Sequence, residues 1–466
     1  MCGVFGVSNI PDAAHQVYMG LYALQHRGQE SAGIITVDDD NVAHAHRSMG
    51  LVVDIFSTDI LDSMPGSVGI GHTRYSTAGS SVISNAQPCA VDYHTGPLAL
   101  AHNGNLTNAV ELRRDLVSKG SIFQTSSDSE VLVHLIARSE ARKPEDQILD
   151  ALERVEGAYT LVLTVGKTLY GIVDPRGFRP LVLGKLNDGY VLASETCALD
   201  IVGATRVREL QPGEWLRIDG NEVQDLPPLP PKQHRRCIFE LIYFSRPDSE
   251  IFGESIDRFR RNLGRRLAQE YPAPGADCVF SVPDSSNAMA LGYSEQSGIK
   301  LEHGLIRNHY VGRTFISPGQ LARTEKARIK FNPVREVVDG KSVVVVDDSL
   351  VRGTTSKSLV KMIRHAGAKE IHFRSSSPPI TGPCYYGIDT PTRGELIAST
   401  HTVEQIRQHL GVDSLGYLSL EGLHAAVERK STGYCDACFS GAYPTAVPDA
   451  EPDAPSIETP VPATVR

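Results

Sequence analysis

The sequence predicts an α+β domain followed by an α/β domain with a parallel sheet. Short β-rich segments separated by Gly, Asn and Asp turns fill the first half, whereas strands and helices alternate in the second half. The proline-dense stretch DLPPLPPKQH at 225–234 interrupts both helix and strand, which predicts a semi-rigid connector. We therefore place a first domain at 2–225, a connector at 226–234 and a second domain at 235–443, a division that suits a chain of 466 residues.

The composition is that of a folded globular protein. Residues of the AVILMFWYC set make up 41% of the chain, and charged residues make up 22%. The formal net charge is -9 and no basic block stands out, so we expect no nucleic acid partner. No apolar run reaches the roughly 18 residues of a membrane-spanning helix, and the start of the chain lacks a basic stretch followed by a long apolar segment. These patterns predict a cytoplasmic protein without a membrane partner.

The predicted strands of the first domain include residues 3–7, 33–37 and 159–165, each bounded by turn-forming residues. One helix is predicted over residues 13–25, because its apolar residues recur at helical spacing and Gly28 lies just past its end. Short strands with an early helix are typical of an α+β domain.

In the second domain, strands are predicted over residues 277–282, 342–347 and 370–374, and a helix over residues 355–365. The unbroken run of valines within 342–347 is typical of a strand that is buried on both faces of a parallel sheet. Residues 444–466 mix prolines, alanines and acids without periodicity, so we expect a disordered tail there.

Cys2 follows Met1 directly and precedes Gly3. The small Cys2 side chain favours removal of Met1 by an aminopeptidase, which would leave a thiol on the first residue. A free α-amino group has a pKa near 7.7–8.0 and is suited to take the proton of its own thiol. One residue would then supply both a nucleophile and a base. Taken alone, Cys2 also fits a small buried hydrophobic residue.

Four further segments accompany Cys2. They are QHRGQESAG at 25–33, GHTRYST at 71–77, HNGNL at 102–106 and SDSE at 127–130. With these motifs in this order, residues 2–220 resemble the glutamine amidotransferases of the amino-terminal-nucleophile class. The resemblance implies an αββα glutaminase fold for the first domain, the N-terminal-nucleophile fold.

The resemblance also implies which residues act on the substrate amide. Cys2 would attack the side-chain amide of glutamine, and Asn103 with the Gly104 backbone N–H would form the oxyanion hole. The anionic tetrahedral intermediate needs donors already aimed at the developing charge, and one such donor typically contributes about 3–4 kcal/mol. Taken alone, the Asn103-Gly104 pair also fits a tight turn.

By the same resemblance, Arg74 would pair with the α-carboxylate of glutamine, Asp128 would receive its α-ammonium, and Arg27 would belong to the same site. A planar guanidinium suits bidentate capture of a carboxylate, although Arg74 alone also fits a surface ion pair. We expect His26 and His72 to be structural hydrogen-bonding groups, because the terminal amine already serves as the base.

The string Asp347-Asp348-Ser349-Leu350-Val351-Arg352-Gly353-Thr354-Thr355 joins the predicted strand at 342–347 to the helix that follows. The N–H groups of such a turn and the threonine hydroxyls suit a phosphate at the positive end of the helix dipole. The two acids suit sugar hydroxyls and Mg²⁺. The spacing is not that of a Walker loop. Without its context, a pair of acids after a strand also fits a solvated turn.

Residues 343–355 resemble the phosphoribosyl-diphosphate signature of the type I phosphoribosyltransferases. The resemblance implies that α/β fold for the second domain, with both acids on the ribose and the 5-phosphate in the turn. The residues implied in substrate binding are Asp347, Asp348, Ser349, Arg352, Gly353, Thr354 and Thr355. VPDSS at 282–286 resembles a second part of this site, in which Ser285 joins Asp347 and Asp348 around Mg²⁺.

A cationic segment lies between these two motifs. RNHYVGRTFI at 307–316 leads into four further basic residues, Arg323, Lys326, Arg328 and Lys330. Such a segment suits closure over a diphosphate leaving group, although an ordinary solvated loop fits the same composition.

An ammonia-releasing half joined to a phosphoribose-binding half suggests one reaction. Glutamine, water and phosphoribosyl diphosphate would yield glutamate, diphosphate and 5-phosphoribosylamine, and the chain resembles the glutamine phosphoribosyl-diphosphate amidotransferases. Free ammonia would be protonated and diluted in water, so we expect it to pass inside the protein, with Tyr243 either lining that passage or packing in the core. The alternatives are an amidotransferase acting on a hexose phosphate or aspartate, and a phosphoribosyl-diphosphate-binding regulatory protein with a degenerate glutaminase half.

Cys435 and Cys438 form a C-x-x-C pair, which suits one metal or cluster, or redox chemistry. Together with Cys237 and Cys384 they resemble the ligands of the iron–sulfur branch of this family. The resemblance implies a [4Fe–4S] cluster that fastens the carboxyl-terminal segment. Zinc in the same four-thiolate cage is the alternative. The other cysteines are expected to be packed as hydrophobic residues: Cys89, Cys197 and Cys278.

The family resemblance implies three further properties. The chain is expected to form a dimer or tetramer, and purine nucleotides are expected to inhibit it. Members of the iron–sulfur branch often carry a propeptide before the nucleophile, whereas only Met1 precedes Cys2 in this sequence. Either the chain needs no autoprocessing or a propeptide has been removed.

Overall fold

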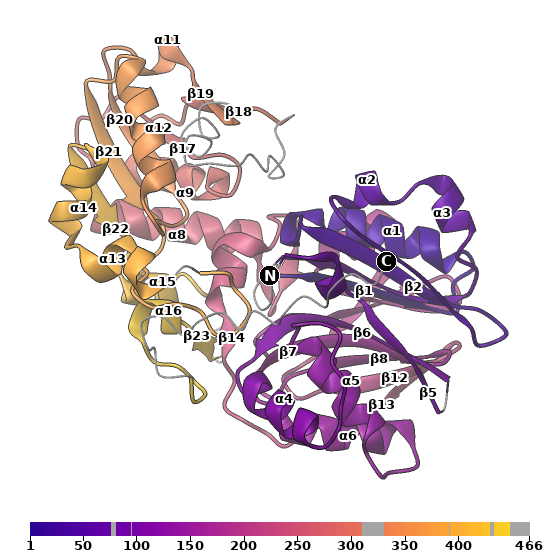
Figure 1. Ribbon diagram of the computed structural model, residues 1–466. Helices are drawn as coiled ribbons and strands as arrows, with labels where there is room; N and C mark the ends of the chain where they lie inside the picture. The colour runs from indigo at the N-terminus through magenta and orange to yellow at the C-terminus, as the bar shows by residue number, and fades with distance from the viewer. Residues whose placement is uncertain (76–80, 95, 310–329, 391, 429–432, 448–466) are drawn as a thin grey trace, which may run out of the picture.

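The computed structural model describes residues 1–75, 81–94, 96–309, 330–390, 392–428 and 433–447. Figure 1 shows two stacked sheets in the indigo-to-magenta part of the chain and a third, smaller sheet in the pink-to-yellow part. The amino terminus lies where these two parts meet (Figure 1). Among the described residues, no helix combines the length and apolar character needed to cross a membrane.

Two antiparallel sheets stack face to face in the first domain. The seven-stranded sheet has the order β11-β9-β10-β1-β4-β2-β3, with β1 (Gly3–Ser8), β2 (Ser31–Val37), β3 (Ala43–Met49), β4 (Val68–Arg74), β9 (Val182–Leu186), β10 (Gly189–Ala193) and β11 (Thr205–Glu209). The six-stranded sheet has the order β13-β12-β8-β7-β6-β5, with β5 (Cys89–Tyr93), β6 (Gly96–Leu106), β7 (Gly157–Val165), β8 (Thr168–Val173), β12 (Trp215–Asp219) and β13 (Glu222–Asp225). Val4, Ile70, Ala101 and Val162 belong to the apolar cluster between the sheets.

Helices cover both outer faces of this sandwich. The face of the seven-stranded sheet packs against α1 (Ala13–Ala23), α2 (Val52–Ile55), α3 (Thr58–Asp62) and α7 (Thr196–Val202). The face of the six-stranded sheet packs against α4 (Ala109–Ser118), α5 (Ser129–Ala137) and α6 (Pro144–Arg154). The resulting order of layers is helix, sheet, sheet, helix, which confirms the predicted αββα fold.

The second domain is built on a parallel sheet of order β17-β20-β21-β22. Its strands are β17 (Cys278–Ser281), β20 (Ser342–Asp347), β21 (Glu370–Ser375) and β22 (Ser414–Tyr417). Val344 and Val346 of β20 face the apolar cluster of α8 (Ile256–Glu270) and α9 (Asn287–Ser297). Val343 and Val345 face the opposite cluster, with α12 (Thr354–His365) and α14 (Val403–Leu410). Both faces of β20 are therefore buried, as the run of valines predicts.

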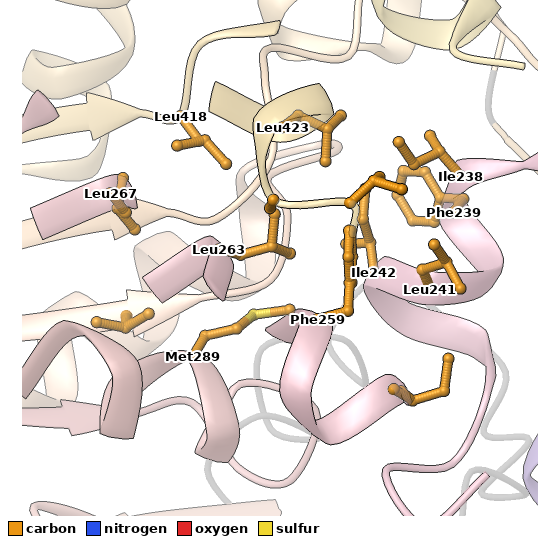
Figure 2. Packing of buried hydrophobic residues seen from close by; sticks show 14 of the residues in the cluster. Ile238, Phe239, Leu241, Ile242, Phe259, Leu263, Leu267, Met289, Leu418 and Leu423 are labelled. Atoms are coloured by element: carbon orange, nitrogen blue, oxygen red, sulfur yellow. The ribbon is translucent and has the colours of Figure 1, made fainter. Parts of the chain in front are cut away.

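Residues 226–235 contain no regular element and join β13 to the second domain. The remaining described elements of that domain are short: β14 (Arg236–Cys237), a π-helical turn (Glu240–Phe244), β15 (Glu250–Ile251), β16 (Glu254–Ser255), β18 (Leu305–Arg307), β19 (Phe331–Pro333), α11 (Arg335–Val338), a 3-10 turn (Arg393–Glu395), α13 (Ile397–Thr400), α15 (Leu420–Ala425), β23 (Tyr434–Cys435) and α16 (Ala437–Ser440). Figure 2 shows how Ile238, Leu241 and Ile242 at the start of this domain pack beside α8 and α15.

The predicted helix at 13–25 ends earlier than expected. The α-helix stops at Ala23 and the chain continues as a 3-10 turn over Gln25–Arg27. The Gln25 side chain stabilises this turn, because it donates to the Gly28 carbonyl at 2.6 Å and accepts from the Val52 N–H at 2.7 Å. The described chain continues past residue 443, and the Thr445 N–H donates to the Tyr386 hydroxyl at 3.1 Å. Residues 448–466 of the predicted tail lie outside the described part.

Helices α8 and α9 approach each other through glycine. A Cβ atom at Gly292 would collide with the Arg261 carbonyl, and one at Gly264 would collide with the Met289 carbonyl. Overpacking of this kind costs about 1–3 kcal/mol. We therefore expect Gly292→Ala to lower the free energy of unfolding of the second domain by that amount in urea titrations. Gly394→Ala, at a position with open space around it, is the control and should change stability by a few tenths of a kcal/mol. Equal stability of the two variants would contradict the close approach.

Candidate active sites

Strand β1 places Cys2 at the junction of the domains. The Cys2 backbone N–H donates to Asn103 Oδ1 at 3.1 Å, and the Cys2 Sγ lies 3.6 Å from the Tyr75 carbonyl oxygen. Cys2 is 6% exposed, and Met1 is fully buried in the apolar cluster of the second domain. Burial lowers the pKa of the Met1 terminal ammonium to about 5. A charged terminus is therefore unfavourable at this place.

Asn103 and Gly104 lie side by side in β6, opposite Thr160 and Tyr159 of β7. Asn103 is fully buried, and among the described residues its Nδ2 has no hydrogen-bond partner. A buried donor without a partner is costly unless a ligand supplies an acceptor. A side chain at Gly104 would collide with the Ala158 carbonyl, so only glycine fits there. Asn103 Nδ2 therefore has the properties of a preorganised oxyanion donor beside Cys2.

Arg74 and Asp128, the residues predicted to bind the charged ends of glutamine, each make a contact within the first domain. Arg74, 4% exposed, ends β4 next to Tyr75, and its Nη1 lies 3.8 Å from Glu30 Oε2. Asp128 precedes α5, and its Oδ2 accepts from the Leu106 N–H at 2.9 Å, two residues beyond Gly104. The predicted ammonium-binding carboxylate is thus tied to the strand that carries the predicted oxyanion donors.

Arg27 makes contacts that the sequence does not predict. Its Nε donates to the Cys2 carbonyl at 2.9 Å, its Nη1 to Glu195 Oε1 at 2.5 Å and its Nη2 to Glu240 Oε1 at 2.7 Å. Arg27, Glu195 and Glu240 are all fully buried. His26 Nε2 lies 2.8 Å from the same Glu195 oxygen. Arg27 therefore holds the backbone of Cys2, and His26 makes a hydrogen-bonding contact with the same buried glutamate.

The predicted magnesium residues meet at the carboxyl ends of neighbouring parallel strands, β17 and β20. Ser285 Oγ donates to Asp348 Oδ2 at 2.5 Å, and Ser349 Oγ donates to Asp348 Oδ1 at 2.6 Å. Asp347 is the last residue of β20 and accepts from the Asp348 N–H at 3.0 Å. Two nearly buried carboxylates with adjacent hydroxyls are a donor set that suits Mg²⁺ bound together with a substrate phosphate.

Gly353, Thr354 and Thr355 form the start of α12. Gly353 is the N-cap with φ 72°, a left-handed conformation that favours glycine, and the two threonines begin the helix. The exposed N–H groups of this first turn suit an anion. Arg352 is half-exposed and its Nε lies 3.4 Å from Glu395 Oε1. The turn therefore has the conformation expected of a phosphate-binding loop.

One cleft of about 640 Å³ contains these residues and reaches the first domain. The predicted substrate residues that line it are Ser285, Asp347, Asp348, Ser349, Arg352, Gly353, Thr354 and Thr355. Its other wall includes His26 and Tyr75 of the first domain and the half-buried Tyr243. Of the cationic segment, Arg307 and Lys330 line the cleft, whereas residues 310–329 lie outside the described residues.

Asp347 makes the free energy of unfolding of the protein depend on pH. Burial and the neighbouring Asp348 carboxylate raise the pKa of Asp347 well above 3.8. At pH values between the pKa of Asp347 in the unfolded chain and its higher pKa in the folded protein, the folded protein binds more protons than the unfolded chain. The free energy of unfolding therefore falls as pH rises through this range. We expect this fall in urea titrations without Mg²⁺, and Asp347→Asn should flatten it and stabilise the protein at neutral pH.

Asp413→Asn is the control for this pH profile. Burial alone would raise the pKa of Asp413, but hydrogen bonds from the Ile371 N–H and Arg364 lower it. Its contribution to stability is therefore present at neutral pH and is lost as pH falls through the folded pKa. Asp413→Asn should destabilise the protein at neutral pH, opposite in sign to Asp347→Asn. Parallel wild-type and Asp347→Asn profiles would contradict the raised pKa.

The four cysteines predicted to share a ligand line one internal cavity, together with Phe178, Tyr386 and Tyr443. Cys237 and Cys435 are paired in the parallel bridge between β14 and β23, and Cys438 follows in α16. Burial raises the pKa of the Cys237, Cys435 and Cys438 thiols. Within the described ranges, no group of three or more His, Cys, Asp or Glu side chains is arranged to hold one metal ion. The other cysteines are buried or half-buried: Cys89, Cys197 and Cys278.

Comparison with known proteins agrees with both halves of this architecture. A family model described as "Glutamine amidotransferase domain" matches residues 72–200. The chain is 50% identical over 444 residues to amidophosphoribosyltransferase 2, chloroplastic, of Arabidopsis thaliana, covering 95% of this chain and 79% of that protein. It is 50% identical over 451 residues to amidophosphoribosyltransferase of Bacillus subtilis, covering 96% of this chain and 94% of that protein.

A solved structure is similar over nearly the whole length. It is described as glutamine phosphoribosylpyrophosphate (PRPP) amidotransferase from B. subtilis complexed with ADP and GMP. The TM-score is 0.90 at 48% identity, with 96% of this chain and 98% of that chain covered. The chain therefore belongs to the amidophosphoribosyltransferases, which combine a glutaminase domain with a phosphoribosyltransferase domain and make 5-phosphoribosylamine from glutamine, water and phosphoribosyl diphosphate in the first step of purine biosynthesis.

Proposed function

We propose that ammonia released at Cys2 passes through the protein to the phosphoribosyl-diphosphate site. The cleft is the observation that supports this proposal, since residues of both domains line it. Tyr75 lines the cleft and its carbonyl oxygen lies 3.6 Å from the Cys2 Sγ. Tyr243 and Phe244 line the same cleft, and the Phe244 ring packs edge-on against Tyr75, with ring centroids 6.4 Å apart. Passage past these aromatic side chains would keep ammonia away from bulk water until it reacts.

In the glutaminase step, Cys2 acts once Met1 has been removed. The terminal amine takes the thiol proton, and the Cys2 Sγ attacks the amide carbon of glutamine. Asn103 Nδ2 and the Gly104 N–H stabilise the oxyanion. The protonated amine returns its proton to the leaving nitrogen, ammonia departs, and water then hydrolyses the thioester to glutamate. Arg27 contributes by holding the Cys2 backbone.

Arg74 and Asp128 hold the two charged ends of glutamine in this proposal. The Arg74 guanidinium would exchange its contact with Glu30 for the substrate carboxylate. Asp128 accepts the ammonium while its Oδ2 stays tied to the Leu106 N–H. The two contacts orient the side-chain amide toward Cys2.

Asn103→Ala tests the glutaminase assignment. Loss of one oxyanion donor lowers kcat by about 100- to 1,000-fold. We therefore expect glutamate release to fall by that factor, while the rate with added ammonium stays near the wild-type rate. Asn108→Ala removes an amide that bonds the Arg154 carbonyl near the surface and should leave both rates unchanged. An Asn103→Ala enzyme with normal glutamate release would contradict the assignment.

In the transferase step, ammonia displaces diphosphate from the anomeric carbon of the bound sugar. Asp347 and Asp348 bind the ribose hydroxyls, and the turn from Ser349 to Thr355 binds the 5-phosphate. Asp347, Asp348 and Ser285 would hold Mg²⁺, which supplies charge stabilisation for the departing diphosphate. The short contact between Ser285 and Asp348 supports this grouping. Arg307 and Lys330 add positive charge on the same cleft.

We also propose that Cys237, Cys384, Cys435 and Cys438 hold a [4Fe–4S] cluster. Their common cavity supports this, because it brings four thiols from three separate segments together. Such a group would fasten the carboxyl-terminal segment, including β23 and α16, to the start of the second domain. An absorption spectrum with iron, sulfide and zinc analysis of the purified protein tests it. Iron with equimolar sulfide is expected; zinc without sulfide would show the alternative tetrahedral thiolate site.

Regulation and assembly are proposed from the relatives. The similar B. subtilis structure is complexed with ADP and GMP, and another similar structure is described as that of the allosteric regulatory enzyme of purine biosynthesis. We infer that purine nucleotides inhibit this chain as well, that it forms a dimer or tetramer, and that it acts in the cytoplasm. Inhibition by GMP and ADP and the mass in solution can be measured directly on the purified protein.

A further inference from the structure

A network of buried charges lies between the four-cysteine cavity and Cys2. Its members are two arginines and two glutamates, all fully buried: Arg27, Arg179, Glu195 and Glu240. An unpaired charge in the protein interior is strongly unfavourable, so these groups keep fixed partners. A displacement of one member should therefore displace the charged side chain that it contacts.

Arg179 lies at the cysteine end of this network. The carbonyl of the preceding residue, Phe178, accepts from the Cys237 N–H at 3.1 Å. The Arg179 Nη2 donates to the Tyr386 carbonyl, and the Tyr386 N–H lies 3.3 Å from the Cys384 Sγ. The rings of Phe178 and Tyr386 stack with centroids 4.4 Å apart, and both line the cavity. Arg179 thus contacts the segment that carries Cys384, and the preceding residue, Phe178, contacts the backbone of Cys237.

Part of the Arg179 guanidinium has no hydrogen-bonding partner. Its Nε is buried and, within the described part of the chain, makes no hydrogen bond. A buried cation with an unused donor is costly unless negative charge lies nearby. Four thiolates around a metal group would supply that charge in the adjacent cavity.

Glu240 connects Arg179 to the nucleophile. One oxygen, Glu240 Oε1, lies 3.5 Å from Arg179 Nη1 and 2.7 Å from Arg27 Nη2. Arg27 Nε in turn donates to the Cys2 carbonyl at 2.9 Å. The side chains of Arg179, Glu240 and Arg27, each in contact with the next, therefore connect the Cys384 segment to the backbone of Cys2.

We propose that Arg179 and Glu240 are positioning residues that couple occupancy of the four-cysteine site to the reactivity of Cys2. The occupied site fixes the Cys384 and Cys237 segments against Arg179. Arg179 then holds Glu240 in place on Arg27, and Arg27 holds the Cys2 carbonyl. Without the metal group, the two segments separate, and Arg27 loses the fixed carboxylate that orients it. This inference rests on the metal site proposed above.

The experiment measures the alkylation rate of Cys2 by iodoacetamide in the full chain, read on the amino-terminal peptide by mass spectrometry. Removal of the metal with a chelator under reducing conditions should slow the wild type by about 10-fold, the range typical of outer-shell contacts. In Arg179→Met, Cys2 should be alkylated about 10-fold more slowly than in the wild type before the metal is removed. Chelation should not change this rate further, and the metal content of the variant should equal that of the wild type. Arg179→Lys should restore part of the rate and of the chelator response.

Arg374→Met is the matched control, because Arg374 is also a buried arginine that donates to backbone carbonyls, those of Tyr271 and Pro272. It should alkylate at the wild-type rate and respond to chelation as the wild type does. Glu240→Gln breaks the same connection with an isosteric side chain and should show the same alkylation rate as Arg179→Met. It provides the test if the methionine variant does not fold.

Two results would overturn the coupling: wild-type alkylation of Cys2 in both Arg179→Met and Glu240→Gln, or a chelator effect that persists undiminished in them. The proposed metal site is tested independently of this coupling, and it would be contradicted if analysis of the wild type found no metal on the cysteines. In that case, slow alkylation in both variants still supports the connection from Arg179 to Cys2, and wild-type rates still overturn it.

Discussion

Replacing Cys2 with alanine is expected to abolish glutamine-dependent synthesis of 5-phosphoribosylamine while ammonium-dependent synthesis continues near the wild-type rate. Loss of the nucleophile in a well-studied serine protease costs on the order of 10⁶ in kcat, so we expect glutamate release to fall by at least about 1,000-fold. The phosphoribose residues lie in the other domain, at the carboxyl ends of β17 and β20. Glutamate release and diphosphate release, each measured with glutamine and with ammonium chloride, separate the two activities.

Cys89→Ala is the matched control for this experiment. Cys89 is a half-buried cysteine of β5 in the same domain, and burial raises the pKa of its thiol to about 12, so it is a poor nucleophile. The control should keep both activities. A Cys2→Ala enzyme that also fails with ammonium would contradict two separable sites, and one that still uses glutamine would remove Cys2 from the mechanism.

The second large effect is expected for Asp348→Asn. Loss of this carboxylate removes a proposed magnesium and ribose contact and leaves the hydroxyls of Ser285 and Ser349 without their charged acceptor. Metal-assisted charge stabilisation contributes several kcal/mol, so we expect diphosphate release to fall by at least about 100-fold with either nitrogen source. Measurement of the same two products at saturating Mg²⁺ tests this, and basal glutamate release should persist.

Asp413→Asn provides the comparison, because Asp413 lies at the amino end of the same parallel sheet, next to β22. Its carboxylate bonds Arg364 and the Ile371 N–H and does not line the cleft among the described residues. This variant should keep diphosphate release within about two-fold, the ordinary effect of a surface change. If Asp348→Asn behaved in the same way, the assignment of the acids to the substrate would be wrong.

Short motifs predict much of both sites, because their chemistry is local in the chain. Asp347 ends a strand that is recognisable as buried and Asp348 follows it, and the next helix begins at Thr354, one residue before the predicted start. The αββα fold and the parallel sheet also follow from the motifs and from the pattern of elements. These features depend on residues that are near neighbours in sequence.

The partners of Arg27 could not be predicted in this way. Glu195 and Glu240 are 168 and 213 residues away from Arg27, and nothing in the residues around them indicates a shared buried pair. The contact between Ser285 and Asp348 could not be predicted from the spacing of the two residues either, and only the family resemblance implies it. Contacts of this kind arise from the packing of whole domains, and a single sequence contains no direct record of them.

The burial of Met1 restricts how the protein can be handled. The residue is fully enclosed, within the apolar cluster of the second domain, and the Cys2 N–H is bonded to Asn103. A purification tag or fusion partner attached at this end would have to thread between the two halves of the molecule. Such a fusion should yield protein that either loses glutamine use or fails to assemble.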